Sequence, residues 1–342
     1  MNFYWIVPLL AAVSFALTAG LRRYALARSL LDVPNGRSSH SVPTPRGGGV
    51  AIVLSYIAAL VVLFGWGLIS PDVLIAFLGA GATTAVIGVL DDHGHIAARW
   101  RLLAHFFAAA WGACWLGGLA PFTLFGFSID AGRIGHLLAV VYLVWMLNLY
   151  NFMDGIDGIA SLEAITVCFG GALLYWGSGN IGLAWPAMLL AACVVGFLCW
   201  NFPPAKIFMG DAGSGFLGIV LGLLSLQAAW ISPGLLWAWL ILLGVFIVDA
   251  TFTLLRRLFR GDKVYEAHRS HAYQFASRSH GSHLPVTLAV GLINLLWLLP
   301  VAMGVVLYNW DGTLALVVAY APLVWLAVRY KAGQLEGRTS NI

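Results

Sequence analysis

Residues 73–92 read VLIAFLGAGATTAVIGVLDD, an apolar run that ends at two adjacent carboxylates. No residue between Val73 and Leu90 is charged, and about 20 such residues cross a hydrocarbon core of about 30 Å as one helix. Similar runs recur along the whole chain, and none shows the period-two alternation that is typical of outer-membrane strands. The sequence therefore predicts an all-α, polytopic membrane protein built as a helical bundle.

The composition indicates the same solvent. Of the 342 residues, 61% are hydrophobic and only 9% are charged, whereas a soluble domain carries about a quarter charged residues. So little polar surface cannot cover a water-facing globule, and most of the chain must face lipid. The four cysteines lie within apolar runs and show no metal-ligand spacing, which indicates small buried side chains. We expect no nucleic-acid partner.

The apolar runs predict about eleven transmembrane helices. The first run is followed by Arg22 and Arg23 and has no basic residue before it. This is the reverse of a cleavable signal peptide, so we expect a retained helix with a periplasmic N-terminus and, after eleven crossings, a cytoplasmic C-terminus. The predicted ranges are 3–20, 48–68, 72–90, 102–119, 136–152, 159–177, 183–200, 214–231, 235–255, 285–307 and 313–330.

The basic residues support this orientation. Of the 18 Lys and Arg, only Arg133 falls outside the predicted cytoplasmic segments and their helix ends, as the positive-inside rule requires. Almost every Asp, His and Asn with catalytic potential lies on the same side. We therefore expect a single transmembrane catalytic domain over 1–342, in the bacterial inner membrane, with a cytoplasmic active site. The loops that form it are 21–47, 91–101, 153–158, 201–213 and 256–284.

Asp91 and Asp92 close one predicted span. Adjacent carboxylates repel each other, and the helix C-terminus adds partial negative charge, so a cation should lie close by. A divalent metal could supply it, and so could Arg99 or Arg101. The alternative is a hydrated loop in which the charges are compensated.

A second acidic motif is NLYNFMDGIDGIAS (148–161), in which Asn148, Asn151, Asp154 and Asp157 recur every three residues. In a helical turn these side chains would point toward one side, and such oxygen ligands suit Mg²⁺ or Mn²⁺. The glycines between them indicate a break where backbone can approach a ligand closely. A polar turn between helices is the alternative.

The stretch NFPPAKIFMGDAGSGFLG (201–218) places a glycine-rich turn before a predicted span. Backbone N–H groups at such a helix start favour a phosphate, and Asp211 could hold its metal. Lys206 and Ser214 flank the turn. Phe208 could stack on a nucleobase or anchor the loop at the membrane interface, and the sequence leaves both open.

Two basic loops complete the pattern. RRLFRGDKVYEAHRSHAYQ (256–274) would draw anionic headgroups, but a lipid anchor alone does not explain its closely spaced histidines. GRSSHSVPTPRGGGVAI (36–52) contains Arg46 before three glycines and is typical of an anion-binding hinge, although basic glycine-rich linkers are common. Asp249 lies inside a predicted span, either as a functional carboxylate or as a structural partner.

Taken together, these loops resemble the polyprenyl-phosphate N-acetylhexosamine-1-phosphate transferase family (glycosyltransferase family 4), nearly from end to end. Five fairly specific motifs occur in the family's order on the predicted cytoplasmic face. They are PTPRGGG (43–49), LDD (90–92), NFMDGIDG (151–158), NFPPAKIFMGDAGS (201–214) and AHRSHAYQ (267–274).

The resemblance implies Mg²⁺, with Mn²⁺ as the alternative, held by Asn151 and Asp211. It implies that Asp91 and Asp92 activate and position the phosphate of a lipid acceptor, undecaprenyl phosphate, beside a UDP-sugar donor. The other implied residues are Asp154 and Asp157 at the nucleotide, Asn201 and Phe208 at the uridine, and Arg46, Lys206, His268, Arg269 and His271 around the diphosphate.

The last basic loop departs from the peptidoglycan branch of the family, which carries consecutive histidines followed by Glu where this chain reads HRSHAYQ. A lysine that usually follows the acidic pair in that branch is also missing. Both differences favour the branch that starts O-antigen or other surface polysaccharides, over phospho-N-acetylmuramoyl-pentapeptide or teichoic-acid-linkage transferases. A membrane transporter is the rival from another class. The sequence leaves the sugar and the oligomeric state open, with a homodimer compatible.

Overall fold

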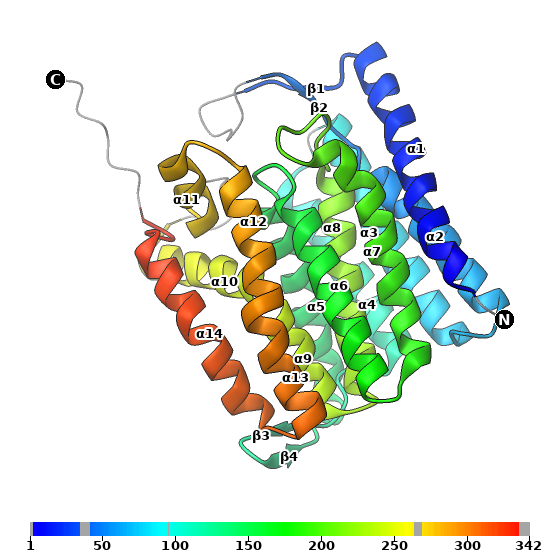
Figure 1. The fold of residues 1–342 in the computed structure, drawn as a ribbon, viewed down its shortest axis with the longest axis vertical. Helices are drawn as coiled ribbons and strands as arrows, with labels where there is room; N and C mark the ends of the chain where they lie inside the picture. Colours follow the sequence, from blue (N-terminus) through cyan, green and yellow to red (C-terminus); the bar gives the residue numbers. More distant parts are fainter. Residues whose placement is uncertain (1–2, 35–41, 95, 263–268, 335–342) are drawn as a thin grey trace.

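The computed structural model describes residues 3–34, 42–94, 96–262 and 269–334, which form an all-α bundle with two small hairpins (Figure 1). A short 3₁₀ turn, η1 (Phe3–Trp5), precedes the first helix, and a π-helical segment, η2, joins α12 to α13. The elements are α1 (Ile6–Ala27), β1 (Leu31–Asp32), β2 (Thr44–Pro45), α2 (Val50–Gly65), α3 (Pro71–His93), α4 (Ala98–Leu116), β3 (Phe122–Leu124), β4 (Phe127–Ile129), α5 (Ile134–Met153), α6 (Ile159–Gly177), α7 (Ile181–Asn201), α8 (Asp211–Ala229), α9 (Pro233–Leu242), α10 (Gly244–Phe259), α11 (Ala272–His280), α12 (Leu284–Ile293), η2 (Asn294–Leu298), α13 (Leu299–Tyr308) and α14 (Gly312–Arg329).

Every predicted span coincides with a helical segment, which confirms an all-α polytopic bundle, whereas the count of eleven spans and the side of each terminus stay predictions. Among the described residues, eight helices are long and apolar enough to cross a membrane, counting Leu284–Tyr308 as one. The predicted span 235–255 is not one straight helix, because α9 and α10 meet at a bend of 71°. The break falls at Leu243, directly before Gly244, and glycine is a poor helix former. The apolar helix α2 has only 16 residues.

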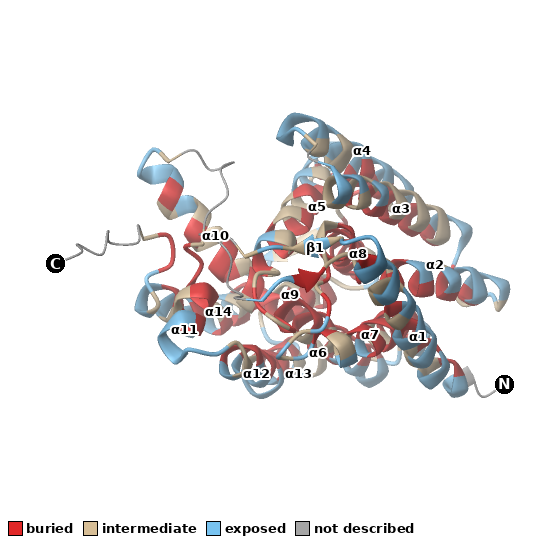
Figure 2. Ribbon diagram, turned by 90° about the horizontal axis from the view of Figure 1, so that it is seen from above, coloured by how far each residue is buried: buried red, intermediate tan, exposed pale blue. Residues whose placement is uncertain are grey.

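Helix α8 is the centre of the bundle, since 94% of its apolar stretch is buried. Glycines let its neighbours approach closely: a Cβ on Gly218 would lie 2.6 Å from the Met146 carbonyl oxygen of α5. A Cβ on Gly88 of α3 would lie 2.4 Å from Cα of Ala212. Small residues of this kind allow tight helix packing in membranes. Buried residues face inward and exposed residues lie at the periphery, as a lipid-facing bundle requires (Figure 2).

The loops that carry the sequence motifs gather at one end of the bundle, opposite the β3–β4 hairpin (Figure 1). Strand β1 pairs with β2 in antiparallel fashion, and the chain then runs beside the segment before α8. There Phe208 N–H donates to the Pro45 carbonyl at 2.8 Å, and Gly48 N–H donates to the Phe208 carbonyl at 2.9 Å. These bonds join the two glycine-rich motifs into one backbone platform.

Candidate active site

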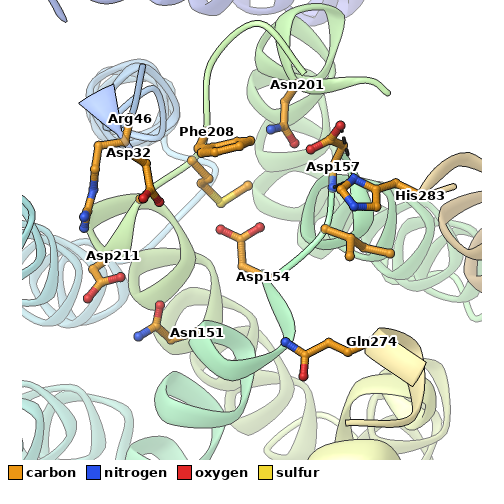
Figure 3. Close-up of a pocket in the computed structure, with 14 residues that line it drawn as sticks. Asp32, Arg46, Asn151, Asp154, Asp157, Asn201, Phe208, Asp211, Gln274 and His283 are labelled. Atoms are coloured by element: carbon orange, nitrogen blue, oxygen red, sulfur yellow. Dashed lines mark hydrogen bonds and ion pairs between the residues drawn. The ribbon is translucent and has the colours of Figure 1, made fainter. Parts of the chain in front are cut away.

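A cavity of about 360 Å³ opens at this end of the bundle. In Figure 3, the Asp154 carboxylate lies in the middle, with Asp211 and Arg46 on one side and Asp157 and His283 on the other. Segments far apart in sequence therefore converge on one site, as the sequence predicts. The cavity is lined by Asp32, Arg46, Asn151, Asp154, Gly155, Ile156, Asp157, Asn201, Phe208, Met209, Gly210, Asp211, Gln274 and His283.

Asp92 forms part of the wall behind the cavity. Its side chain is only 3% exposed and forms an ion pair with Arg46. It also accepts hydrogen bonds from the backbone N–H groups of Asp211 (3.2 Å) and Ala212 (3.5 Å), the first residues of α8. A carboxylate at this position satisfies donors that the helix leaves free and matches the positive end of its dipole. Asp92 therefore caps α8 and fixes Asp211 at the cavity edge.

Gly210 permits this arrangement. Its φ of +77° lies in the left-handed region, and a Cβ there would lie 2.5 Å from Oδ2 of Asp92. A side chain at this position would therefore strain the backbone and displace the cap.

Asp91, the neighbour of Asp92, does not line this cavity and has a different set of partners. It accepts a hydrogen bond from Ile96 N–H at 2.9 Å and pairs with Arg101, whose guanidinium also lies 3.5 Å from Asp211 Oδ2. Arg101 thus supplies the cation expected beside the acidic pair. Arg99 lies instead over the Trp100 ring, 5.6 Å from its centre.

Asn151 and Asp154 stand at the end of α5. Asn151 Oδ1 accepts a hydrogen bond from Ser214 Oγ of α8 at 2.6 Å, so Asn151 and Asp211 are held on facing helix ends. Burial, together with the nearby charges of Asp211, Asp92 and Asp157, raises the pKa of Asp154 well above its usual value. Several carboxylates therefore compete for cationic compensation within one cavity.

These donors fit a hard divalent cation. Oxygen ligands suit Mg²⁺, which commonly takes one or two carboxylates and completes its shell with water and substrate phosphates. Within the part of the chain that the structure describes, no three His, Cys, Asp or Glu side chains form a ready-made metal cluster. A magnesium site here would therefore combine Asp211 and the Asn151 oxygen with oxygens of the substrate.

The opposite side of the cavity is built from Phe208, Asn201 and Asp157. The Phe208 ring lies along the cavity edge (Figure 3). Asn201 is 3% exposed, accepts from Gly158 N–H at 3.0 Å and donates to the Ile207 carbonyl at 3.0 Å, so it clamps two loops together. Asp157 accepts from Ala205 N–H at 3.0 Å and lies 3.2 Å from His283 Nδ1.

Three of the predicted basic residues do not line this cavity. The exposed Lys206 extends over the Trp200 ring, with Nζ 5.7 Å from its centre. His271 is buried, with Nδ1 3.4 Å from Asp249 Oδ1, and its ring stacks with those of Phe152 and Tyr273. Arg269 accepts a hydrogen bond from Arg278 on its carbonyl. The prediction for His268 lies outside the described residues.

Three cavity residues with polar side chains were missed by the sequence reasoning, namely Asp32, Gln274 and His283. Gln274 lies in the motif AHRSHAYQ, but the motif was interpreted from its charged residues, and the Gln274 amide is neutral. Asp32 follows the first span, and its position becomes significant only when β1 pairs with β2. His283 immediately precedes α12. A polar residue at a helix end is common, so its position alone does not indicate a functional site.

Comparison with known proteins identifies the family. Residues 74–229 match the family model described as glycosyl transferase family 4. The chain is 29% identical over 299 residues to a probable undecaprenyl-phosphate N-acetylglucosaminyl 1-phosphate transferase of Bacillus subtilis, covering 86% of this chain and 82% of the relative.

It is 30% identical over 337 residues to decaprenyl-phosphate N-acetylglucosaminephosphotransferase of Mycobacterium leprae, covering 87% and 84% of the two chains. Over 222 residues it is 32% identical to phospho-N-acetylmuramoyl-pentapeptide-transferase of Shouchella clausii, covering 58% and 65%. These matches confirm the resemblance seen in the motifs. This multi-pass membrane protein belongs to the polyprenyl-phosphate N-acetylhexosamine-1-phosphate transferase family.

Proposed function

We propose that the chain transfers an N-acetylhexosamine-1-phosphate, or a deoxy derivative of it, from a UDP-sugar to undecaprenyl phosphate on the cytoplasmic face of the bacterial inner membrane. The products are undecaprenyl-diphospho-sugar and UMP. We assign this reaction to the first step of O-antigen or another surface polysaccharide. The observation that carries the proposal is the convergence of Asn151, Asp154, Asp211 and Phe208 on one cavity at the loop end of the bundle.

The polarity of the cavity favours one orientation of the donor. The charged side, with Arg46 and Asp211, suits the diphosphate, and Phe208 offers an aromatic face to the uracil. Mg²⁺ bound to Asn151 and Asp211 would neutralise charge on the diphosphate and on the leaving UMP. The first N–H groups of α8 are already bonded to Asp92, so the diphosphate would be bound by Arg46 and the metal and not by this helix start.

We place the acceptor phosphate beside Asp91 and Arg101, next to the donor cavity. A smaller cavity of about 30 Å³ is lined by Asp91, Arg101 and Asn148, and it shares Asn151 and Asp211 with the donor cavity. A lipid phosphate beside Arg101 would therefore lie next to the sugar-bearing phosphorus. Its oxygen attacks that phosphorus, the bond to the bridging oxygen breaks, and UMP leaves with the electron pair. The second pKa of such a phosphate is near 6, so Asp91 positions the acceptor more than it deprotonates it.

Incubating membranes with labelled UDP-sugars and undecaprenyl phosphate, then counting label in the organic phase, tests the proposal. We expect incorporation that a chelator abolishes and added Mg²⁺ restores. Because one diphosphate bond replaces another, added UMP should drive exchange back into UDP-sugar. Purified protein with no UMP-dependent exchange would contradict the scheme.

The same assay separates the branches. UDP-N-acetylmuramoyl-pentapeptide as the only accepted donor would assign the chain to the activity named for the Shouchella clausii relative. Incorporation of a simple UDP-N-acetylhexosamine supports the proposed branch.

A further inference from the structure

Asp249 of α10 has an unusual set of partners for a carboxylate inside a bundle. It is 6% exposed, and its oxygens accept hydrogen bonds from Ala272 N–H at 2.9 Å and Tyr273 N–H at 3.0 Å. Thr253 Oγ1 donates from the next turn at 3.1 Å, and His271 Nδ1 lies 3.4 Å away. The carboxylate is therefore directed at the start of another helix.

That helix is α11, which begins at Ala272. The first N–H groups of a helix have no partner within it, and a negative charge there also matches the helix dipole. Within α11 the Gln274 side chain accepts from the His271 N–H at 3.3 Å, which leaves the N–H groups of Ala272 and Tyr273 to Asp249. A carboxylate on one helix thus forms the N-terminal cap of another.

The start of α11 in turn touches the donor cavity. The Tyr273 hydroxyl donates to the Phe152 carbonyl at 3.0 Å, at the end of α5 that carries Asn151 and Asp154. A Cβ added to Gly155 would lie 2.1 Å from that hydroxyl, so the contact leaves no free space. Gln274, the next residue, lines the cavity itself.

We propose that Asp249 is a positioning residue: it holds the first turn of α11 so that Tyr273 supports the end of α5 and Gln274 closes the donor cavity. The carboxylate acts through these residues, because it does not itself line the donor cavity. Its effect on transfer rests on the proposed function, whereas its hold on α11 does not. This assigns a role to an intramembrane carboxylate that the sequence motifs left unexplained.

Amide hydrogen exchange on the purified full-length protein tests the hold directly. Asp249→Ala should raise exchange in Ala272–His280 at least tenfold, and exchange in α8 should not change. Asp249→Asn keeps one acceptor oxygen and the side-chain shape, so it should give a smaller increase and remains informative if the alanine variant misfolds. Asp262→Asn is the matched control, because Asp262 pairs with Arg260 on the surface near the end of the same helix. Unchanged exchange in Ala272–His280 for both Asp249 variants would overturn the proposal.

Kinetics test the consequence for transfer. Asp249→Asn should raise KM for UDP-N-acetylglucosamine, or whichever UDP-sugar the wild-type protein accepts, by about tenfold, the effect of one weakened charge-assisted contact. The KM for undecaprenyl phosphate should stay within twofold. A merely structural role would lower the active fraction, and so kcat, at unchanged KM, and that result would refute the positioning role.

A double-mutant cycle closes the test. Tyr273→Phe removes the hydroxyl contact with Phe152, so its effect on donor KM should be largely lost in an Asp249→Asn background. If the fold-changes in donor KM of the two single variants simply multiply in the double variant, the proposed connection between Asp249 and Tyr273 is refuted. Wild-type protein without any transfer would remove the proposed function, and the exchange experiment would still decide whether Asp249 holds α11.

Discussion

Asp92 and Asp211 provide the sharpest test of the site, because the same Asp→Asn change should have different consequences at the two positions. Asp92 is 3% exposed, pairs with Arg46 and accepts two backbone hydrogen bonds at the start of α8. Asn keeps the shape but loses the charge and presents an N–H₂ group to one of these donors. Hydrogen bonds to charged groups contribute about 1.5–3 kcal/mol, so we expect Asp92→Asn to lower the free energy of unfolding by about 2 kcal/mol.

The Asp211 carboxylate contributes much less to the fold. Its side chain is 30% exposed, and its ion pair with Arg101 is long, at 3.5 Å. Removing its charge also relieves repulsion from Asp91 and Asp92. Asp211→Asn should therefore change the free energy of unfolding by less than about 0.5 kcal/mol, as is usual for substitutions outside packed or paired positions. It should nevertheless lower transfer at least 100-fold, because it removes a proposed magnesium ligand.

Thermal unfolding and label transfer on the same purified samples measure both quantities. At roughly 2–4 °C per kcal/mol, Asp92→Asn should lower Tm by about 4–8 °C, with Asp211→Asn close to wild type. Asp211→Asn protein with more than a tenth of wild-type turnover would refute the metal assignment. Equal melting temperatures for all three proteins would refute the capping role of Asp92.

Three further substitutions probe other parts of the site. Phe208→Ala should raise donor KM about tenfold or more with acceptor KM unchanged, because base stacking contributes about 1–3 kcal/mol; an unchanged donor KM would exclude stacking. Lys206→Ala should leave turnover within twofold, since Lys206 lies on Trp200 outside the cavity. A large loss of turnover would instead support the predicted contact of Lys206 with the diphosphate. Gly210→Ala should abolish transfer and lower Tm, because its Cβ would meet Asp92 at a left-handed backbone position; wild-type behaviour would contradict the close contact.

Hydrophobic periodicity and charge were sufficient to predict the long apolar helices and the end of the bundle that carries the site. They did not predict α11, which lies within the range 256–284 that we expected to be a loop. Long apolar runs fix helix positions because each must satisfy its own backbone in lipid. They do not reveal a bend, so the break at Leu243 in the predicted span 235–255 was missed. The direction of α10, and with it the position of Asp249, depends on that bend.

The row of Asn148, Asn151, Asp154 and Asp157 shows where spacing alone fails. Equal spacing predicts one common direction only while the helix continues, and α5 ends at Met153. Asn148 consequently lines the smaller cavity, Asn151 lines both, and Asp154 and Asp157 line only the donor cavity. All four residues line one or both cavities, and their division between the two follows from the helix end.

Two buried carboxylates, Asp92 and Asp249, share a physical role that sequence cannot separate from chemistry. Each lies on one helix and accepts the first N–H groups of another, α8 for Asp92 and α11 for Asp249. Substituting either would move a wall of the donor cavity and reduce transfer even if its oxygens never met a substrate. Loss of activity at Asp92 is therefore no evidence of proton transfer. A role for Asp92 in acceptor chemistry would require an effect on acceptor KM or on the pH profile beyond that explained by lost stability.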